Sequence, residues 1–330
     1  MKDIETDSYS ESPQDLRRVV PLFGAGLTRA FQRRRKAAPE SSADDEWAIK
    51  ARPVPRPGRW IATVVVGLLI AMLVHGLITN GTFGWGVVRH YFFTSLVLSG
   101  VRLTVILTVV SMAAGIAIGI VVAVMRMSPN PLMSNASRLY VWFFRGTPLL
   151  VQLIFWYNIG ALYPKISVGV PFGPSFTSFS ANHVLTSLVA ALVGLSLNEG
   201  AYMAEIIRSG IIAVDVGQIE AARSLGMRHR LLLRRIVLPQ AMRVVIPPTG
   251  NQVITMLKTT SLCSVLAIAE LLYSVELIYQ RNFETIPLLI VASLWYLLMT
   301  TVLSVGQYYL ERHFGRGHVT MLTLNLQHRR

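Results

Sequence analysis

The chain of 330 residues has almost no cysteine and few charged side chains. Its single cysteine, Cys263, excludes an internal disulfide and a cysteine-based metal cluster, so we expect it to pack as a small apolar residue. Only 15% of the residues are charged, whereas 52% are hydrophobic, and this balance excludes an ordinary soluble globular protein. The composition is typical of a polypeptide that crosses a membrane several times.

Common sequence signatures of catalytic sites are also missing. The chain has no G-x-x-x-x-G-K-[ST] phosphate-binding loop, so it does not bind ATP by that route. It has neither the H-E-x-x-H pair of a zinc site nor the G-x-S-x-G turn of a hydrolase. We therefore expect no enzymatic activity, no bound metal and no cofactor, and we expect any energy source to lie in another subunit.

Long apolar runs are what the sequence does have. Six of them are long enough to cross the hydrocarbon core of a bilayer, at residues 61–79, 103–125, 139–162, 184–207, 245–273 and 287–310. The fifth run is interrupted by Pro247, Pro248, Asn251 and Lys258, so its membrane boundaries stay open, and part of it is expected to form either a separate cytoplasmic helix or a kinked one. The sequence thus predicts an all-α integral membrane protein with six transmembrane helices.

Basic residues outnumber acidic ones, with 31 Lys and Arg against 17 Asp and Glu and a net charge of +14. They gather at the ends of the apolar runs, so the excess reflects membrane topology and not a nucleic-acid-binding face. Because Lys and Arg concentrate in cytoplasmic loops, both termini are predicted to be cytoplasmic. Residues 1–60 are expected to form a mostly disordered basic tail, either solvated or in contact with anionic lipid, and residues 316–330 a second cytoplasmic tail.

A polar and basic stretch, 213–251, separates two of the apolar runs. Asp215 and Gln218 predict a capped helix with a capping box, and Gly226 is placed to end that helix. A basic amphipathic helix, 228–238, follows and leads to Pro239, which is expected to break or kink the backbone. This helix alone could be an interfacial anchor whose arginines face lipid phosphates. The small surface of Ala221 and Ala222 instead favours a protein groove, so we expect a partner to dock here.

The same stretch resembles the EAA loop of ABC importer permeases. Glu220-Ala221-Ala222, Gly226 and 236–239 match E-A-A-x-x-x-G, nine residues, I-x-L-P. Two further blocks, 145–152 and 257–262, are similar to the polar amino acid branch, whose members carry histidine, glutamine, glutamate or arginine. The resemblance covers 91–315, a five-span core, and makes 61–79 an added N-terminal helix.

The resemblance implies a permease subunit of a bacterial inner or plasma membrane importer. A separate ATPase would dock on the coupling loop 213–240 and contact Gln218, Glu220, Ala221, Ala222 and Gly226. The further partners it implies are a second permease subunit, an extracytoplasmic solute-binding protein, the amino acid and membrane lipid, with no nucleic acid.

Polar residues within the apolar runs mark the candidate substrate path, because each is costly in lipid and tends to face a bundle interior. They are Gln152, Asn198, Glu199, Lys258, Thr259, Thr260 and Ser261. Lys258 could meet the substrate carboxylate and Glu199 its ammonium group. Alternatively both could be structural, pairing with each other or facing water. Members of the family often have an acidic residue where this chain has Thr259. The resemblance therefore implies a pocket with one negative charge fewer, which favours a neutral or acidic substrate over a cationic one.

Other interpretations remain open at this point. A secondary transporter could use Glu199, Lys258 and Glu270 as a proton relay, although the chain shows no internal repeat. A membrane scaffold would have no need for polar residues within its spans. Small residues at 115–119 suggest a helix-packing face, within the subunit or across a dimer. Two further side chains, Glu205 and Arg208, are spaced to form a structural ion pair.

Overall fold

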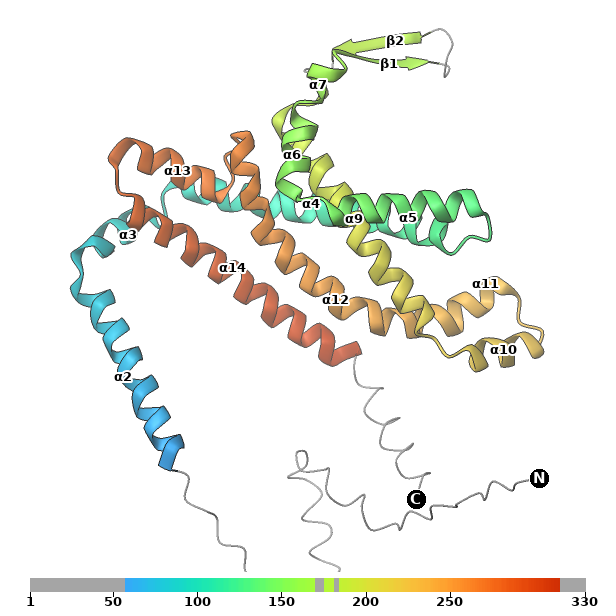
Figure 1. The fold of residues 1–330 in the computed structure, drawn as a ribbon, viewed down its shortest axis with the longest axis horizontal. Coiled ribbons are helices and arrows are strands. Elements are labelled where there is room, and N and C mark those ends of the chain that lie inside the picture. Colours follow the sequence, from blue (N-terminus) through green and yellow to red (C-terminus); the bar gives the residue numbers. More distant parts are fainter. Residues whose placement is uncertain (1–56, 170–174, 181–183, 315–330) are drawn as a thin grey trace, which may run out of the picture. The chain divides into compact units, whose positions relative to one another are not determined.

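The computed structural model describes residues 57–169, 175–180 and 184–314. Most of the two predicted tails, 1–60 and 316–330, lies outside the described residues. The chain divides into two units, Met1–Ile70 and Ala71–Arg330. Figure 1 shows its helices and a small two-stranded ladder.

The N-terminal apolar run forms a helix. Helix α2, Pro57–Thr79, contains the predicted span 61–79, none of whose side chains is fully buried. A 3-10 turn, η4 (Gly81–Phe83), and a short helix, α3 (Trp85–Tyr91), follow it. The indole nitrogen of Trp85 donates a 2.9 Å hydrogen bond to the carbonyl of Leu77.

Helices α4, Ser95–Arg126, and α9, Ser187–Ile212, form the most extensive helix pair of the described chain. Glycines permit their close approach: a Cβ on Gly115 would lie 2.7 Å from the Cβ of Glu199, and one on Gly119 would lie 2.5 Å from the Cβ of Met203. The predicted glycine packing face is therefore used within the subunit.

This close contact leads to a stability prediction. In Gly119→Val the added side chain must push α9 away, because the backbone nitrogen of Ala204 is only 3.0 Å from the new Cβ. Overpacking of this kind typically destabilises by about 1–3 kcal/mol. Ala117→Val places the same side chain on the exposed side of α4 and is the matched control. Thermal unfolding in detergent should shift only for Gly119→Val, and equal transition temperatures would contradict the packing assignment.

The predicted third span is two helices and not one. Helix α5, Pro131–Gly146, and helix α6, Leu149–Tyr157, meet at an angle of 103° across Thr147 and Pro148. Pro148 explains the break, because a proline disfavours the helical conformation for the residue before it. A short helix, α7 (Ile159–Leu162), continues from α6. The predicted span 139–162 thus corresponds to a bent pair of helices that can count as one span.

The fifth predicted span is longer than expected and bends elsewhere. It runs through α11 (His229–Leu232), a π-helical turn η5 (Leu233–Val237), α12 (Leu238–Thr259) and a 3-10 segment η6 (Thr260–Leu266). Helix α12 continues through Pro247 and Pro248, where a kink was predicted. The 46° change of direction comes after Leu266, before α13 (Leu271–Asn282), where Ala267 adopts a positive φ of 54°.

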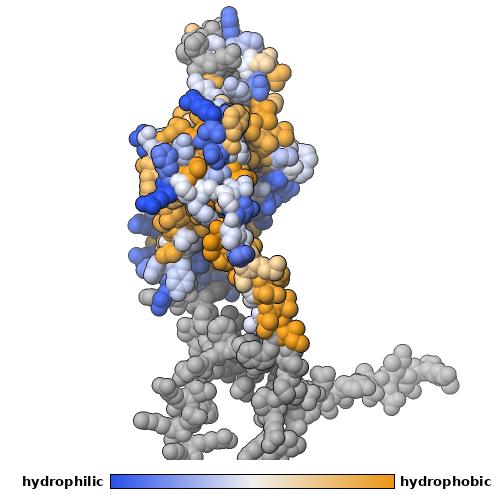
Figure 2. Space-filling model, turned by 90° about the vertical axis from the view of Figure 1, so that its left-hand side faces the viewer, coloured by the Kyte–Doolittle hydropathy of each residue, from blue (hydrophilic) through white to orange (hydrophobic). Residues whose placement is uncertain are grey.

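The last helix, α14 (Thr285–Phe314), packs against α12, α13 and α3. Among the described residues, four helices are long and apolar enough to cross a membrane, or up to six spans result if each bent pair counts as one. In Figure 2, patches of exposed apolar side chains lie among polar ones. Cys263 is fully buried among apolar side chains, as predicted.

One element was not predicted from the sequence. Strand β1, Lys165–Gly169, pairs antiparallel with β2, Ser175–Ser180, with Ile166 opposite Phe179. Within residues 57–169, 175–180 and 184–314 the fold is therefore nearly all helical, with one two-stranded ladder between α7 and α9. Each strand is only five or six residues long, which is too short to form an apolar run of spanning length.

Candidate coupling surface and translocation path

The predicted coupling loop is a folded helical hairpin. Helix α10, Val216–Ser224, begins at Asp215, whose carboxylate accepts a 2.6 Å hydrogen bond from the amide of Gly217. Gly226 follows the helix with φ +73°, and the next amide, that of Met227, donates to the carbonyl of Ala222 at 3.1 Å. This is the hydrogen bond of a Schellman stop, which requires a left-handed residue at the glycine position. The predicted cap and the predicted stop are both present.

The predicted capping box is wrong in one respect. The Gln218 side chain does not return to the helix start; its Oε1 accepts a 2.6 Å hydrogen bond from Nε2 of Gln240 on α12. Gln240 also donates to the carbonyl of Ile236 at 3.1 Å. Gln218 therefore links α10 to the first turn of α12 by a side-chain hydrogen bond, in addition to the backbone connection through the turn at Gly226.

A small apolar core holds this hairpin together. Val214, Ala222, Leu232, Val237 and Ala241 are buried against one another. Ala222 is 3% exposed, whereas Gln218, Glu220, Ala221 and Gly226 are exposed. The five predicted coupling residues thus divide: Ala222 packs inward, and the other four lie at the surface.

The exposed face of the hairpin also carries apolar side chains that the sequence analysis did not select. Leu225 is 83% exposed and Val216 64% exposed. Large apolar side chains that stay exposed next to a rigid turn are suited to burial in a partner's groove. Their position at the two ends of the E-A-A helix is the sequence signal that could have identified them.

The path residues Gln152 and Asn198 are engaged at the break between α5 and α6. Nε2 of Gln152 donates to the carbonyls of Phe144 and Thr147, at 3.0 and 3.2 Å, and Nδ2 of Asn198 donates to the carbonyl of Phe144 at 2.9 Å. The two amides also bond to each other, from Nδ2 of Asn198 to Oε1 of Gln152, at 3.2 Å. They satisfy carbonyls that the broken helix leaves free, which is a structural role.

Glu199 lies one residue further along α9 and is 5% exposed. Its Oε1 has no hydrogen-bond partner among the described residues, and the same is true of the Ser111 hydroxyl, which is buried on α4. Glu199 packs against Gly115, one helical turn from Ser111. Buried polar groups normally have partners, so the α4–α9 interface holds unused hydrogen-bonding capacity at this level.

The remaining path residues lie on α12 and η6. Lys258 is exposed, and the described residues show no ion pair between it and Glu199, so the predicted mutual pair is not formed. Three hydroxyls nearby turn back onto backbone carbonyls: Thr259 to Thr255 at 2.9 Å, Thr260 to Leu257 at 2.7 Å and Ser261 to Lys258 at 2.7 Å. The structure gathers these residues on one segment, with the lysine side chain free of a carboxylate.

Glu270 has a clear structural role. It is fully buried and caps α13, because its carboxylate accepts hydrogen bonds from the amides of Leu272 and Tyr273 at 3.0 and 2.9 Å. The Tyr296 hydroxyl on α14 donates to the same carboxylate at 2.8 Å. Three donors satisfy this group, and it joins α13 to α14.

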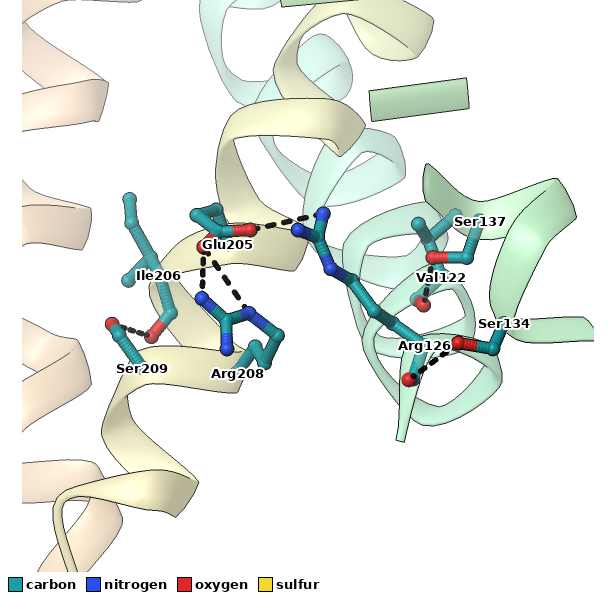
Figure 3. A network of polar contacts seen from close by, with 8 residues as sticks. All are labelled: Val122, Arg126, Ser134, Ser137, Glu205, Ile206, Arg208 and Ser209. Carbon is teal, nitrogen blue, oxygen red and sulfur yellow. Dashed lines mark hydrogen bonds and ion pairs between the residues drawn. The ribbon is translucent and has the colours of Figure 1, made fainter. Parts of the chain in front are cut away.

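An ion network near the α9 end of the coupling loop includes a residue that the sequence analysis missed (Figure 3). Glu205 pairs with Arg208, as predicted, and also with Arg126 of α4, whose Nη1 lies 3.1 Å from Oε2 of Glu205. The Ser134 hydroxyl donates to the Arg126 carbonyl at 3.3 Å, and that of Ser137 donates to the Val122 carbonyl at 2.9 Å. These contacts tie together α4, α5 and α9.

Comparison with known proteins identifies the family. Residues 115–316 match the family described as binding-protein-dependent transport system inner membrane component. The chain is 44% identical over 288 residues to an arginine transport system permease protein of Corynebacterium glutamicum, covering 86% of this chain and 89% of that protein. It is 36% identical over 233 residues to an L-cystine transport system permease protein of Bacillus subtilis, with 70% and 92% covered.

A solved structure agrees with these relatives. The crystal structure of an amino acid ABC transporter with histidines superposes with a TM-score of 0.57 and 34% identity, covering 67% of this chain and 95% of that one. The match with the arginine permease covers 86% of this chain, which is more residues than 91–330 contain. That match therefore also includes the segment that forms α2. The chain belongs to the family of binding-protein-dependent transport system inner membrane components, as an amino acid ABC transporter permease.

Proposed function

We propose that this permease works as one of two membrane subunits of an importer, with a separate ATPase docked on α10 and α11 of the coupling loop. The surface of the α10–α11 hairpin carries the proposal: a helix held in place by its own small core, with Glu220 and Leu225 exposed beside a left-handed glycine. In this scheme ATP binding and hydrolysis move the hairpin. Arg126 links α4 to α9, and Gln218 links α10 to α12. Helices α4, α9 and α12 therefore move with the hairpin.

The same scheme sets the orientation. The coupling loop faces the cytoplasm, where the ATPase lies, and both termini are cytoplasmic. The basic side chains of the loop, Arg228, Arg230, Arg234 and Arg235, are exposed as expected of cytoplasmic residues next to a membrane. A proton-driven secondary transporter is less well supported, because three donors within the fold already occupy Glu270.

For the substrate we propose a cationic amino acid of the arginine type. The presence of Thr259 in place of an acidic residue favoured a neutral or acidic substrate, but the relative that matches 86% of this chain is named as an arginine permease. The carboxyl group of Glu199 is buried, and its Oε1 has no hydrogen-bond partner among the described residues, so it offers an acceptor that a cationic substrate could use. The match over 86% of the chain outweighs the argument from the single position Thr259.

Transport by purified components in liposomes tests this proposal. With a cognate ATPase and binding protein, the permease should take up labelled arginine only when ATP is present, and unlabelled arginine should compete better than glutamate. Without the ATPase, we expect neither ATP hydrolysis nor uptake. Uptake by the permease alone along an ion gradient would favour the secondary transporter instead. Better competition by glutamate than by arginine would favour an acidic substrate, as the presence of Thr259 indicates.

A further inference from the structure

The β1–β2 ladder and the coupling loop lie at opposite ends of α9. The helix begins at Ser187, seven residues after β2 ends, and ends at Ile212, just before α10 (Figure 1). Its 26 residues extend over roughly 39 Å at 1.5 Å per residue, which is enough to cross a hydrocarbon core of about 30 Å. If the coupling loop is cytoplasmic, as in the proposed function on which this inference rests, the ladder lies on the extracytoplasmic side.

The ladder has no stabilising neighbour within the described chain. The two strands pair with each other, and no described helix packs extensively against either of them. A two-stranded ladder alone is marginally stable in water, and each outer edge presents unpaired backbone groups. Such edges are unfavourable in lipid, where an unsatisfied amide or carbonyl costs several kcal/mol. The ladder therefore needs a protein partner more than a membrane surface.

The surroundings of the ladder are also suited to a protein partner. Phe176 on β2 is 77% exposed, and Tyr163, just before β1, is 64% exposed. Aromatic side chains of this kind are enriched at protein interfaces. A cavity of about 600 Å³ opens at the base of the ladder, between the end of α6 and the start of α9, and is lined by Tyr157, Asn158 and Thr186 among others. A protruding element beside a recess can accept a complementary surface.

We propose that the β1–β2 ladder, with Phe176 and Tyr163, is a docking element for the extracytoplasmic solute-binding protein. The family is described as dependent on a binding protein, and the ladder lies on the side of the membrane from which that protein delivers its ligand. The unpaired strand edges offer backbone hydrogen bonds, while the exposed aromatic rings supply apolar area. Delivery of the solute then occurs next to the cavity at the start of α9.

The test uses the complete permease–ATPase complex in nanodiscs and measures ATP hydrolysis as ligand-loaded binding protein is titrated. Phe176→Ser should raise the half-saturating concentration of binding protein about tenfold, while basal hydrolysis and ATPase co-purification stay unchanged. Replacement of Lys165–Ser180 by a short Gly-Ser linker should weaken the response further. Phe283→Ser is the matched control, because Phe283 is 86% exposed, lies between α13 and α14, and is outside the ladder.

An unchanged titration in both ladder variants would overturn the docking proposal and leave the permease function intact. A loss at Phe283 as large as that at Phe176 would overturn it too, because the docking surface would then not be specific to the ladder. A wild-type complex whose ATP hydrolysis does not respond to any binding protein would instead count against the proposed import function. If the ladder variants weaken binding of the complex to protein-free anionic vesicles and leave the titration with binding protein unchanged, the ladder is a lipid-binding element and the docking proposal is wrong.

Discussion

Replacing Gly226 with valine is expected to lower transport at least tenfold while the protein still inserts into the membrane. Gly226 has φ +73°, and nothing lies within 4 Å of the position that a Cβ would take. The penalty is therefore one of backbone conformation, because a left-handed residue costs roughly 1–2 kcal/mol for a residue with a Cβ and more for a β-branched one. That strain would loosen the stop of α10 and displace Glu220 and Leu225 from the docking surface.

Gly226→Asn is the matched control, since asparagine tolerates the left-handed conformation and the surrounding space is open. Co-purification of the ATPase and ATP-dependent uptake should be close to wild type in the asparagine variant and lost in the valine variant. Membrane insertion and yield should be equal in both. Normal uptake by Gly226→Val would show that the shape of this turn does not matter for coupling.

Replacing Lys258 with methionine is expected to abolish amino acid uptake without loss of assembly. Lys258 is exposed on α12 and forms no ion pair among the described residues, so its removal leaves no buried carboxylate unpaired. The fold should tolerate the change. A substrate carboxylate that passes through a low-dielectric path, by contrast, needs a cationic partner, and its loss is strongly unfavourable.

Lys258→Arg keeps the charge and serves as the comparison. We expect it to retain measurable uptake, at a reduced rate because the guanidinium group differs in shape and hydration from the ammonium group. Both variants should co-purify with the ATPase as the wild type does. Equal uptake rates and equal substrate preference for Lys258→Met and wild type would remove Lys258 from the translocation path.

Local sequence accounts for much of what the structure contains. The apolar runs predicted helices because a spanning segment must satisfy its own backbone hydrogen bonds. Asp215 was correctly identified as a cap, Gly226 as a left-handed stop, and Arg208 as a partner of Glu205. Each of these contacts joins residues within a few positions of one another. Helix geometry alone therefore sets the distance between them.

Contacts between distant parts of the chain were decided only by tertiary structure. Gln218 bonds to Gln240, 22 residues away, instead of closing a capping box, because the core around Ala222 brings α12 alongside α10. Gln152 and Asn198 donate hydrogen bonds to the carbonyl of Phe144, and this pairing between α6, α9 and the end of α5 follows only from the packing of these helices.

The α4–α9 contact shows the same division most clearly. The sequence by itself determined that glycines at 115 and 119 make a face for close packing, since the absence of a Cβ is a local property. Which helix would fill that face, and that Arg126 would reach Glu205 at its end, was decided only when α4 and α9 packed together. The physical reason is that a 3.6-residue period specifies one face of a helix, whereas the partner of that face depends on the free energy of packing all helices at once.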